Sequence, residues 1–116
     1  MPKDDAIRFR HMLESALEAL EFTRPHHRSD LDQDRLLLLG LLKLIEILGE
    51  AAARIRPETR NRYPQIPWMD IIDMRNRVVH VYFDIDRDEV WDTVTKDLPP
   101  LIEQLEIILK NEPKGP

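Results

Sequence analysis

The sequence predicts an all-α protein, an antiparallel bundle of four to five helices. None of its nine prolines interrupts a long segment of helical periodicity, so the prolines mark joints between helices. No segment alternates apolar and polar residues as a half-buried strand does. The 116 residues, 42% of them apolar, suffice for one core. We therefore expect a single domain, 1–112, followed by a short tail, 113–116.

The first helix is expected to run from about Asp4 to Phe22. Apolar residues recur along it at helical spacing and predict one buried stripe. The stripe comprises Ile7, Leu13, Ala16, Leu17 and Leu20. A polar connection over residues 23–29 then separates this helix from the next one.

The second helix is predicted from near Asp30 to about Arg56, because Ser29 and Asp32 have the spacing of a capping box. A helix that is apolar on nearly all sides must be buried on all sides, which in a short chain favours packing against a second copy. The sequence thus predicts a homodimer, and a central helix in a monomeric bundle is the alternative. One apolar face comprises Leu31, Leu38, Leu41, Leu42, Ile45, Leu48, Ala52 and Ile55, and further apolar residues around it are Leu37, Leu39, Leu44 and Ile47.

A proline-rich joint, 57–67, precedes the third helix. This long helix is expected to start near Trp68, with Pro67 at its first position, and to carry the segment 74–86, here called the motif segment. The predicted dimer forms across the long second helix and this motif helix.

The end of the chain is expected to hold two more helical segments. Asp86, followed three residues later by Glu89, predicts the N-cap of a helix over about 87–97. A last segment over 99–109 carries Leu101, Ile102, Leu105, Ile108 and Leu109 at helical spacing.

The charge of the chain argues against general adhesion to nucleic acid. The net charge is −5, whereas a phosphate backbone is bound mainly by Lys and Arg. Locally the balance is different, because residues 54–62 hold four arginines and one glutamate. Arg54, Arg62 and Arg77 are therefore candidate RNA contacts, and the alternative reading is that the arginines are solvated helix ends and surface ion pairs. A DNA-reading regulator is not expected, because no basic recognition helix is present.

Several other classes of site are not supported. The apolar run 36–48 is shorter than the roughly 20 residues that span a bilayer, and the N-terminus lacks a signal-peptide core, so a cytoplasmic protein without membrane contact is expected. Asp30-x-Asp32-x-Asp34 lacks the glycine and the glutamate of a calcium loop, and His26-His27 stands alone. No metal and no cofactor are expected.

Within the motif segment, Arg75, His80 and Tyr82 form a pattern suited to phosphate chemistry. Arginine grips a phosphate through a charged fork, and histidine titrates near neutral pH. On a regular helix Arg75 and His80 would lie roughly 140° apart, whereas Asn76 and His80 would share one face. A cleft between two copies would bring Arg and His together around one phosphate. The alternatives are an interior His80 and a Tyr82 packed at the edge of the core.

In its wider context the segment Met74-Arg75-Asn76-Arg77-Val78-Val79-His80-Val81-Tyr82-Phe83-Asp84-Ile85-Asp86 resembles the signature of the HepT toxins of the HEPN superfamily. The stretches 47–55, Pro67-Trp68 and 91–101 are similar to neighbouring parts of that family, so the resemblance covers roughly residues 5 to 110. The chain departs from the family at Asp73 and Val81, where glycine is frequent. An extra carboxylate can weaken phosphate binding, and valine narrows the backbone freedom near Tyr82.

The resemblance implies the toxin of a type VII-like (HepT/MntA) toxin–antitoxin system, dimeric and HEPN-like in fold. It implies that Arg75 and His80 form a metal-independent ribonuclease site. Its antitoxin would be an MntA-type nucleotidyltransferase, which in some members attaches AMP to the tyrosine that corresponds to Tyr82.

The expected reaction is attack of an RNA 2′-hydroxyl on the adjacent phosphodiester. His80 would act as base, the His80 of a second copy as acid, and Arg75 would stabilise the developing charge while Asn76 orients. The rival function is a non-catalytic helical dimer that binds a nucleotide or a partner protein through the Arg75 cleft.

Overall fold

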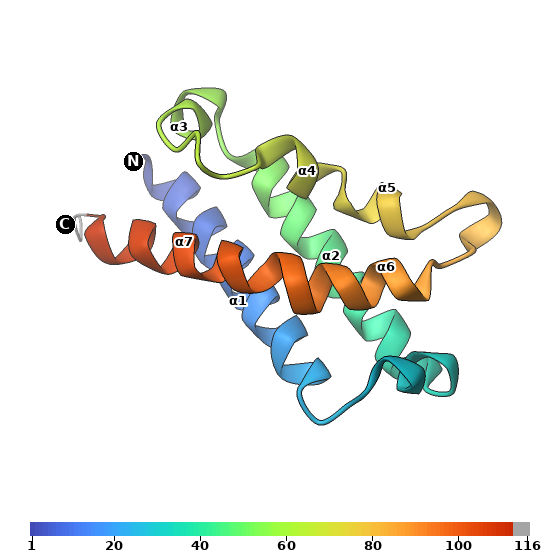
Figure 1. The fold of residues 1–116 in the computed structure, drawn as a ribbon. Coiled ribbons are helices and arrows are strands. Elements are labelled where there is room, and N and C mark those ends of the chain that lie inside the picture. The colour runs from blue at the N-terminus through green and yellow to red at the C-terminus, as the bar shows by residue number, and fades with distance from the viewer. Residues whose placement is uncertain (113–116) are drawn as a thin grey trace.

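The computed structural model describes residues 1–112 apart from the side chain of Phe83, so the predicted tail 113–116 lies outside the described residues. Over that range the chain is all-α, and no β-strand occurs in it. Three long helices form the body of the bundle, and short helices connect them (Figure 1). The long helices are α1 (Lys3–Thr23), α2 (Arg35–Arg54) and α7 (Leu98–Asn111); the short ones are α3 (Pro57–Asn61), α4 (Trp68–Ile72), α5 (Met74–Val78) and α6 (Arg87–Asp92).

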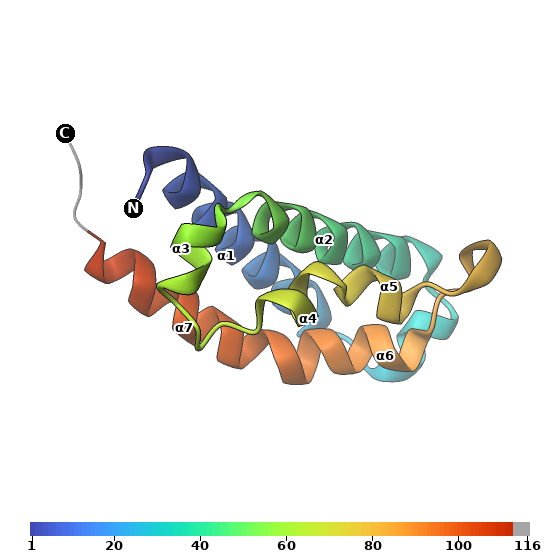
Figure 2. The same cartoon turned by 90° about the horizontal axis from the view of Figure 1, so that it is seen from above.

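Helix α2 is the central element of the bundle. Helix α1 runs antiparallel beside it, and α4, α5 and α6 contact it from other sides. Helices α6 and α7 are joined by a π-helical turn, η3 (Thr93–Asp97), and together form one continuous rod that also packs against α1 (Figure 2). The short helices α4 and α5 therefore lie between α2 and this rod.

The first helix has the predicted extent, but the predicted stripe is only partly correct. Ala16 is buried, and Leu13 and Leu20 pack half-buried against the core. Ile7 and Leu17 are 36% and 42% exposed. The buried face is rotated toward Phe9, whose ring makes edge-to-face contacts with Tyr63 and Trp68 at centroid distances of 5.6 and 5.7 Å. The largest apolar side chain thus decides which face turns inward. The buried apolar residues of α1 are Phe9, Met12, Ala16 and Ala19.

The predicted start of the second helix is also wrong. A short 3₁₀ turn, η1 (Arg28–Asp32), precedes α2, which begins at Arg35. The N-cap is Asp34, whose carboxylate accepts a hydrogen bond from the Leu37 amide at 3.0 Å. Ser29 and Asp32 form no capping box, because Asp30 caps the 3₁₀ turn instead by accepting from the His27 amide.

The predicted inner face of the second helix is confirmed, since all eight of its residues are buried. The bundle also covers part of the remaining apolar surface. Leu44 is buried and Leu37, Leu39 and Ile47 are half-buried, whereas Leu36 is 84% exposed. One chain therefore covers most of α2 by itself, and the homodimer stays a prediction.

The long motif helix predicted from Trp68 is broken. Pro67 is the N-cap of α4, and Asp73 lies between α4 and α5 in a non-helical conformation. Helix α5 ends at Val78, and Val79 is extended. Valines at 78, 79 and 81 favour extended backbone, which accounts for the early end. The helical relations expected among Arg75, Asn76 and His80 are therefore wrong.

The N-cap of the fourth helix is confirmed, because the Asp86 carboxylate accepts from the Glu89 amide at 3.0 Å. The two separate terminal segments are not observed. The chain continues from α6 through η3 into α7, and Pro99 and Pro100 stand in the first turn of α7, where missing amide donors disturb the helix least.

One carboxylate is completely buried, that of Asp5 in the first turn of α1. It accepts a hydrogen bond from the Thr59 hydroxyl at 2.6 Å and one from the Arg56 amide at 3.3 Å. The Trp68 indole donates to the carbonyls of Arg60 and Tyr63, both at 3.1 Å. These contacts fix the joint before α4 against the start of α1.

Candidate functional site

A groove lies between α2 and α5 and holds the first part of the motif segment. Its volume is about 360 Å³. Arg75 and Asn76 form one wall, and Glu46 of α2 forms part of the other. The full lining comprises Glu46, Gly49, Glu50, Ala53, Ile72, Arg75 and Asn76.

Gly49 sets the width of this groove. A Cβ atom at this position would lie 3.1 Å from the Ile71 carbonyl oxygen and 3.4 Å from that of Ile72. A side chain here would push the α4 backbone away by a few tenths of an ångström, so glycine permits the observed close approach. The next residues along the chain, those of α5, are consequently held against α2.

Arg75 is held across the groove by Glu46. Its Nε donates to the Glu46 carboxylate at 2.8 Å, and the two side chains are 41% and 21% exposed. The other carboxylate oxygen of Glu46 lies 3.8 Å from the Lys43 ammonium. Two cations thus lie beside one carboxylate, and a second carboxylate, that of Glu50, also lines the groove. An anionic ligand would therefore have to bind at the Arg75 guanidinium itself.

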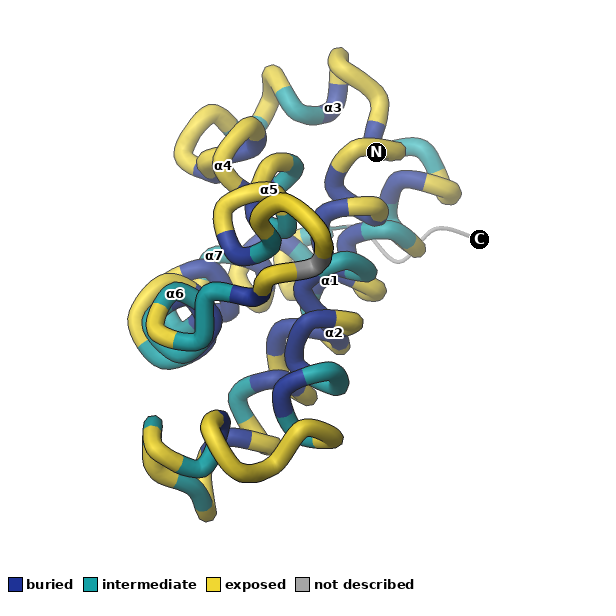
Figure 3. Tube along the Cα trace, turned by 90° about the vertical axis from the view of Figure 1, so that its right-hand side faces the viewer, coloured by how far each residue is buried: buried dark blue, intermediate teal, exposed yellow. Residues whose placement is uncertain are grey.

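His80 and Tyr82 lie in a loop beyond α5. The loop projects from the end of the bundle (Figure 1) and is largely exposed (Figure 3). An antiparallel bridge joins Val79 to Ile85, and the His80 amide donates to the Asp84 carbonyl at 2.7 Å. The His80 side chain is exposed, so the interior alternative is wrong.

Tyr82 stands at the tip of this loop, in the 3₁₀ turn η2 (Val81–Phe83). Its side chain is 100% exposed, so packing at the edge of the core is also wrong. Its φ of 59° is the one positive value at a non-glycine residue in the described chain. Tyrosine is unfavourable there, and such outliers cluster at functional sites.

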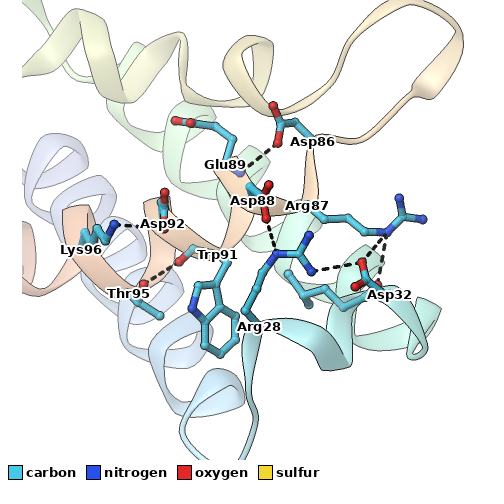
Figure 4. A network of polar contacts seen from close by, with 11 residues as sticks. Arg28, Asp32, Asp86, Arg87, Asp88, Glu89, Trp91, Asp92, Thr95 and Lys96 are labelled. Atoms are coloured by element: carbon cyan, nitrogen blue, oxygen red, sulfur yellow. Dashed lines mark hydrogen bonds and ion pairs between the residues drawn. The ribbon is translucent and has the colours of Figure 1, made fainter.

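The far end of the loop is fixed by polar contacts at the start of α6 (Figure 4). Arg28 of η1 pairs with Asp88 and with Asp32, and Arg87 donates to the Leu31 carbonyl at 3.3 Å. The two carboxylates keep the pKa of Arg28 above its usual value. The loop is therefore anchored at both roots and exposed between them.

The structure brings only some of the predicted residues together. Arg75 and Asn76 share the groove, whereas His80 and Tyr82 do not line it. Arg77 points to another hollow of about 270 Å³, where its guanidinium lies 3.7 Å from the Asp97 carboxylate. Arg54 lines a groove of about 230 Å³ between α1 and α2.

The arginines of the stretch 54–62 form no surface ion pairs among the described residues, but two of them fit the other part of the alternative reading, solvated helix ends. Arg54 and Arg62 are both exposed, the latter at the C-terminal end of α3. Arg54 directly follows Ala53 of the Arg75 groove, and both grooves share Glu50. The two hollows are thus neighbours on α2.

Metal ligands do not cluster in residues 1–112, where no three His, Asp or Glu side chains are placed to hold an ion. His26 instead lies 3.0 Å from the Asp30 carboxylate. In the same part of the chain, no helix is both long and apolar enough to cross a membrane.

Two residues of the groove, Glu46 and Gly49, were not predicted from the sequence to belong to the site. One signal could have found Glu46, because a carboxylate on a half-buried side of an apolar helix needs a partner.

Comparison with known families identifies the chain. Residues 12–108 match the family model described as HepT-like, ribonuclease HepT-like. This match spans most of the chain and includes the groove and the loop. The protein belongs to the HepT-like ribonuclease family.

Relatives from archaea and bacteria agree with this assignment. A protein of Methanocaldococcus jannaschii named "Putative RNase" is 31% identical over 93% of this chain and its own full length. A protein of Thermococcus cleftensis named "Probable ribonuclease HepT" is 33% identical over 84% of this chain and 93% of its own. A "Putative RNase" of Caldanaerobacter subterraneus is 29% identical over 88% and 91%. No solved structure matches the chain significantly.

Proposed function

We propose that this chain is the toxin of a type VII-like (HepT/MntA) toxin–antitoxin system and acts in the cytoplasm as a metal-independent endoribonuclease. The observation that carries the proposal is the motif segment itself. It combines an arginine held in an open groove with an exposed imidazole on an anchored loop, in a chain of a ribonuclease family. The working unit is the domain 1–112.

In the proposed reaction His80 removes the proton from an RNA 2′-hydroxyl, and the oxygen attacks the adjacent phosphorus. The bond from phosphorus to the 5′-oxygen breaks, and the leaving oxygen takes a proton from the His80 of a second copy. The products are a 2′,3′-cyclic phosphate and a 5′-hydroxyl. Arg75 stabilises the extra charge on the phosphorane oxygens, and Asn76 orients the phosphate.

The homodimer is part of the proposal, formed across α2 and the motif segment. His80 does not line the groove of its own chain, so a second copy is one way to supply an imidazole to Arg75. Exposed apolar side chains near these elements, Leu36 at 84% and Val81 at 74%, give such a contact apolar area.

RNA outside the reacting phosphate is proposed to contact Arg54, Arg62 and Arg77. Arg54 and Arg62 are exposed and make no ion pair within the described residues, and Arg54 borders the neighbouring groove. The guanidinium of Arg77 lies 3.7 Å from the Asp97 carboxylate, and a phosphate could replace the carboxylate in this long ion pair. Direct DNA binding is not proposed.

The antitoxin is proposed to be an MntA-type nucleotidyltransferase that modifies Tyr82. The tyrosine oxygen would attack the α-phosphorus of ATP, with release of pyrophosphate and formation of AMP-tyrosine. Full exposure of Tyr82 at a loop tip gives a second active site access to it. The added phosphate would bring negative charge near the RNA-binding groove. Co-expression followed by intact-mass measurement tests this step, and neutralisation without the AMP mass means occlusion alone.

The alternative is a non-catalytic dimer that binds a nucleotide or a partner protein through the Arg75 groove. One observation favours it. Glu46 already occupies Nε of Arg75, and a carboxylate in that place competes with a phosphate.

Cleavage of total RNA in the presence of EDTA separates the two functions. Wild-type protein, purified without any partner, is expected to cut RNA, and His80→Ala is expected to lose most of the activity. The control is His26→Ala, which removes an imidazole from the connection between α1 and α2. Absence of cleavage by a folded wild-type protein with unmodified Tyr82 favours the binding module.

A further inference from the structure

We propose that Glu46 is a positioning residue for Arg75, an inference that rests on the proposed function. Nothing in the motif segment itself supplies this carboxylate, which comes from α2, 29 residues earlier in the chain. The contact joins Nε of the arginine to one carboxylate oxygen at 2.8 Å. Glu46 itself would not touch the reacting atoms.

The point of contact on the guanidinium matters. A guanidinium is a rigid plane with five N–H donors, and a partner at Nε restrains the direction of its Nη1–Nη2 edge. That edge is the one that grips a phosphate through two parallel hydrogen bonds. Glu46 therefore limits where Arg75 can hold a phosphate.

The support behind Glu46 is rigid. Its neighbour Ile45 is 1% exposed in the core, and Gly49 one turn later lets the α4 backbone lie against α2. The carboxylate stands on α2, and the arginine follows three residues after Ile72, where the α4 backbone lies against α2. Precise catalytic geometry depends on such second-layer support.

Stability alone does not account for this ion pair. Arg75 is 41% exposed, and exposed ion pairs contribute little to folding. The second oxygen of Glu46 lies 3.8 Å from the Lys43 ammonium, a long contact with an exposed lysine that adds little stability. We therefore assign the contact between Glu46 and Arg75 the role of orienting the guanidinium.

The experiment compares Glu46→Ala with Glu46→Gln. Glutamine keeps an oxygen acceptor for Nε and removes only the charge, whereas alanine removes both. Positioning predicts that Glu46→Ala lowers kcat by about 10- to 100-fold, the scale of a small misplacement, while Glu46→Gln cleaves near the wild-type rate. Melting temperatures must stay close to wild type. The control is Glu21→Ala, which removes a Glu–Arg ion pair of 2.9 Å on α1.

Three results overturn the inference: wild-type kcat in Glu46→Ala, faster cleavage in both variants, or equal loss in both. Faster cleavage by both variants means that Glu46 holds Arg75 back from the phosphate. An equal loss of kcat in both variants means that the negative charge of Glu46, and not its hydrogen bond, is required.

Binding of a non-cleavable 2′-O-methyl RNA keeps this test separate from the proposed function. If wild type binds this RNA but never cuts RNA, the ribonuclease proposal fails. Positioning then still predicts weaker binding in Arg75→Ala and Glu46→Ala and normal binding in Glu46→Gln. Normal binding in Glu46→Ala, with Arg75→Ala weakened, overturns it.

Discussion

Two carboxylates tie distant parts of the chain to the long helices, and they do so in opposite ways. Asp5 is completely buried and accepts hydrogen bonds from a hydroxyl and a backbone amide, while its cationic neighbour, the Arg8 guanidinium, lies farther away at 4.0 Å. Glu46 is 21% exposed and holds the cations Arg75 and Lys43 beside an open groove. A buried carboxylate hydrogen-bonded by neutral donors serves the fold, whereas a partly exposed one positions a cation beside an open groove.

The largest expected effect lies at the exposed carboxylate and concerns catalysis. Arg75→Ala removes the group proposed to stabilise the phosphorane and should lower kcat about 10²- to 10³-fold, with little change in melting temperature. Arg24→Ala is the control, since Arg24 also forms an ion pair with a glutamate, Glu21 of α1, far from the groove. Equal rates for wild type and Arg75→Ala would remove Arg75 from the mechanism.

The next effect lies at the buried carboxylate and concerns stability. Asp5→Ala leaves the Thr59 hydroxyl and the Arg56 amide without their acceptor, at a cost of about 1–3 kcal/mol in the free energy of unfolding. The exposed neighbour Asp4 gives the control, and Asp4→Ala should change stability by less than about 0.5 kcal/mol. Urea unfolding measures both. Similar stabilities for the two variants would mean that the buried contacts do not matter.

A matched pair of glycines on α2 tests how closely the backbone of α4 is held beside the Arg75 groove. Gly40 has only an ordinary contact of 4.0 Å for an added Cβ, so Gly40→Ala should stabilise the protein by about 0.5–1 kcal/mol. At Gly49 the added Cβ meets the Ile71 carbonyl oxygen at 3.1 Å. Gly49→Ala should therefore be less stable than Gly40→Ala and should cut RNA more slowly. If both alanines stabilise equally, α4 is not held as closely as described.

The smallest effect concerns pH and a carboxylate far from both sites. The His27 amide and then the His26 side chain lower the pKa of Asp30 below its usual 3.8. The ionised form is favoured in the folded state, so its contribution is present above the unfolded pKa and is lost as the pH falls through the folded one. Asp30→Asn should flatten the loss of melting temperature below about pH 4. If the melting temperature of Asp30→Asn falls with pH as steeply as that of wild type, other carboxylates cause the loss.

The sequence predicted what depends on local periodicity and capping. The extent of α1, the inner face of α2 and the Asp86 cap follow from spacing alone, and the structure confirms all three. The all-α class and the family were predicted on the same residues. These features need no knowledge of where distant segments meet.

What the sequence did not predict depends on contacts between distant segments or on competition between local signals. The rotation of α1 is set by Phe9 against Tyr63 and Trp68, more than 50 residues away. The end of α5 at Val78 reflects β-branched residues that override a helical pattern. Glu46 could not be assigned to the site, because its partner lies on another element.

The chemistry of the cleaved ends tests the central claim most directly. A defined RNA is incubated with wild type or His80→Ala in EDTA, and the products are analysed by mass spectrometry. Attack by the 2′-hydroxyl predicts 2′,3′-cyclic phosphate and 5′-hydroxyl ends with wild type, and almost none with a folded His80→Ala. Products ending in 3′-hydroxyl and 5′-phosphate, or cyclic ends formed by His80→Ala at the wild-type rate, would contradict it.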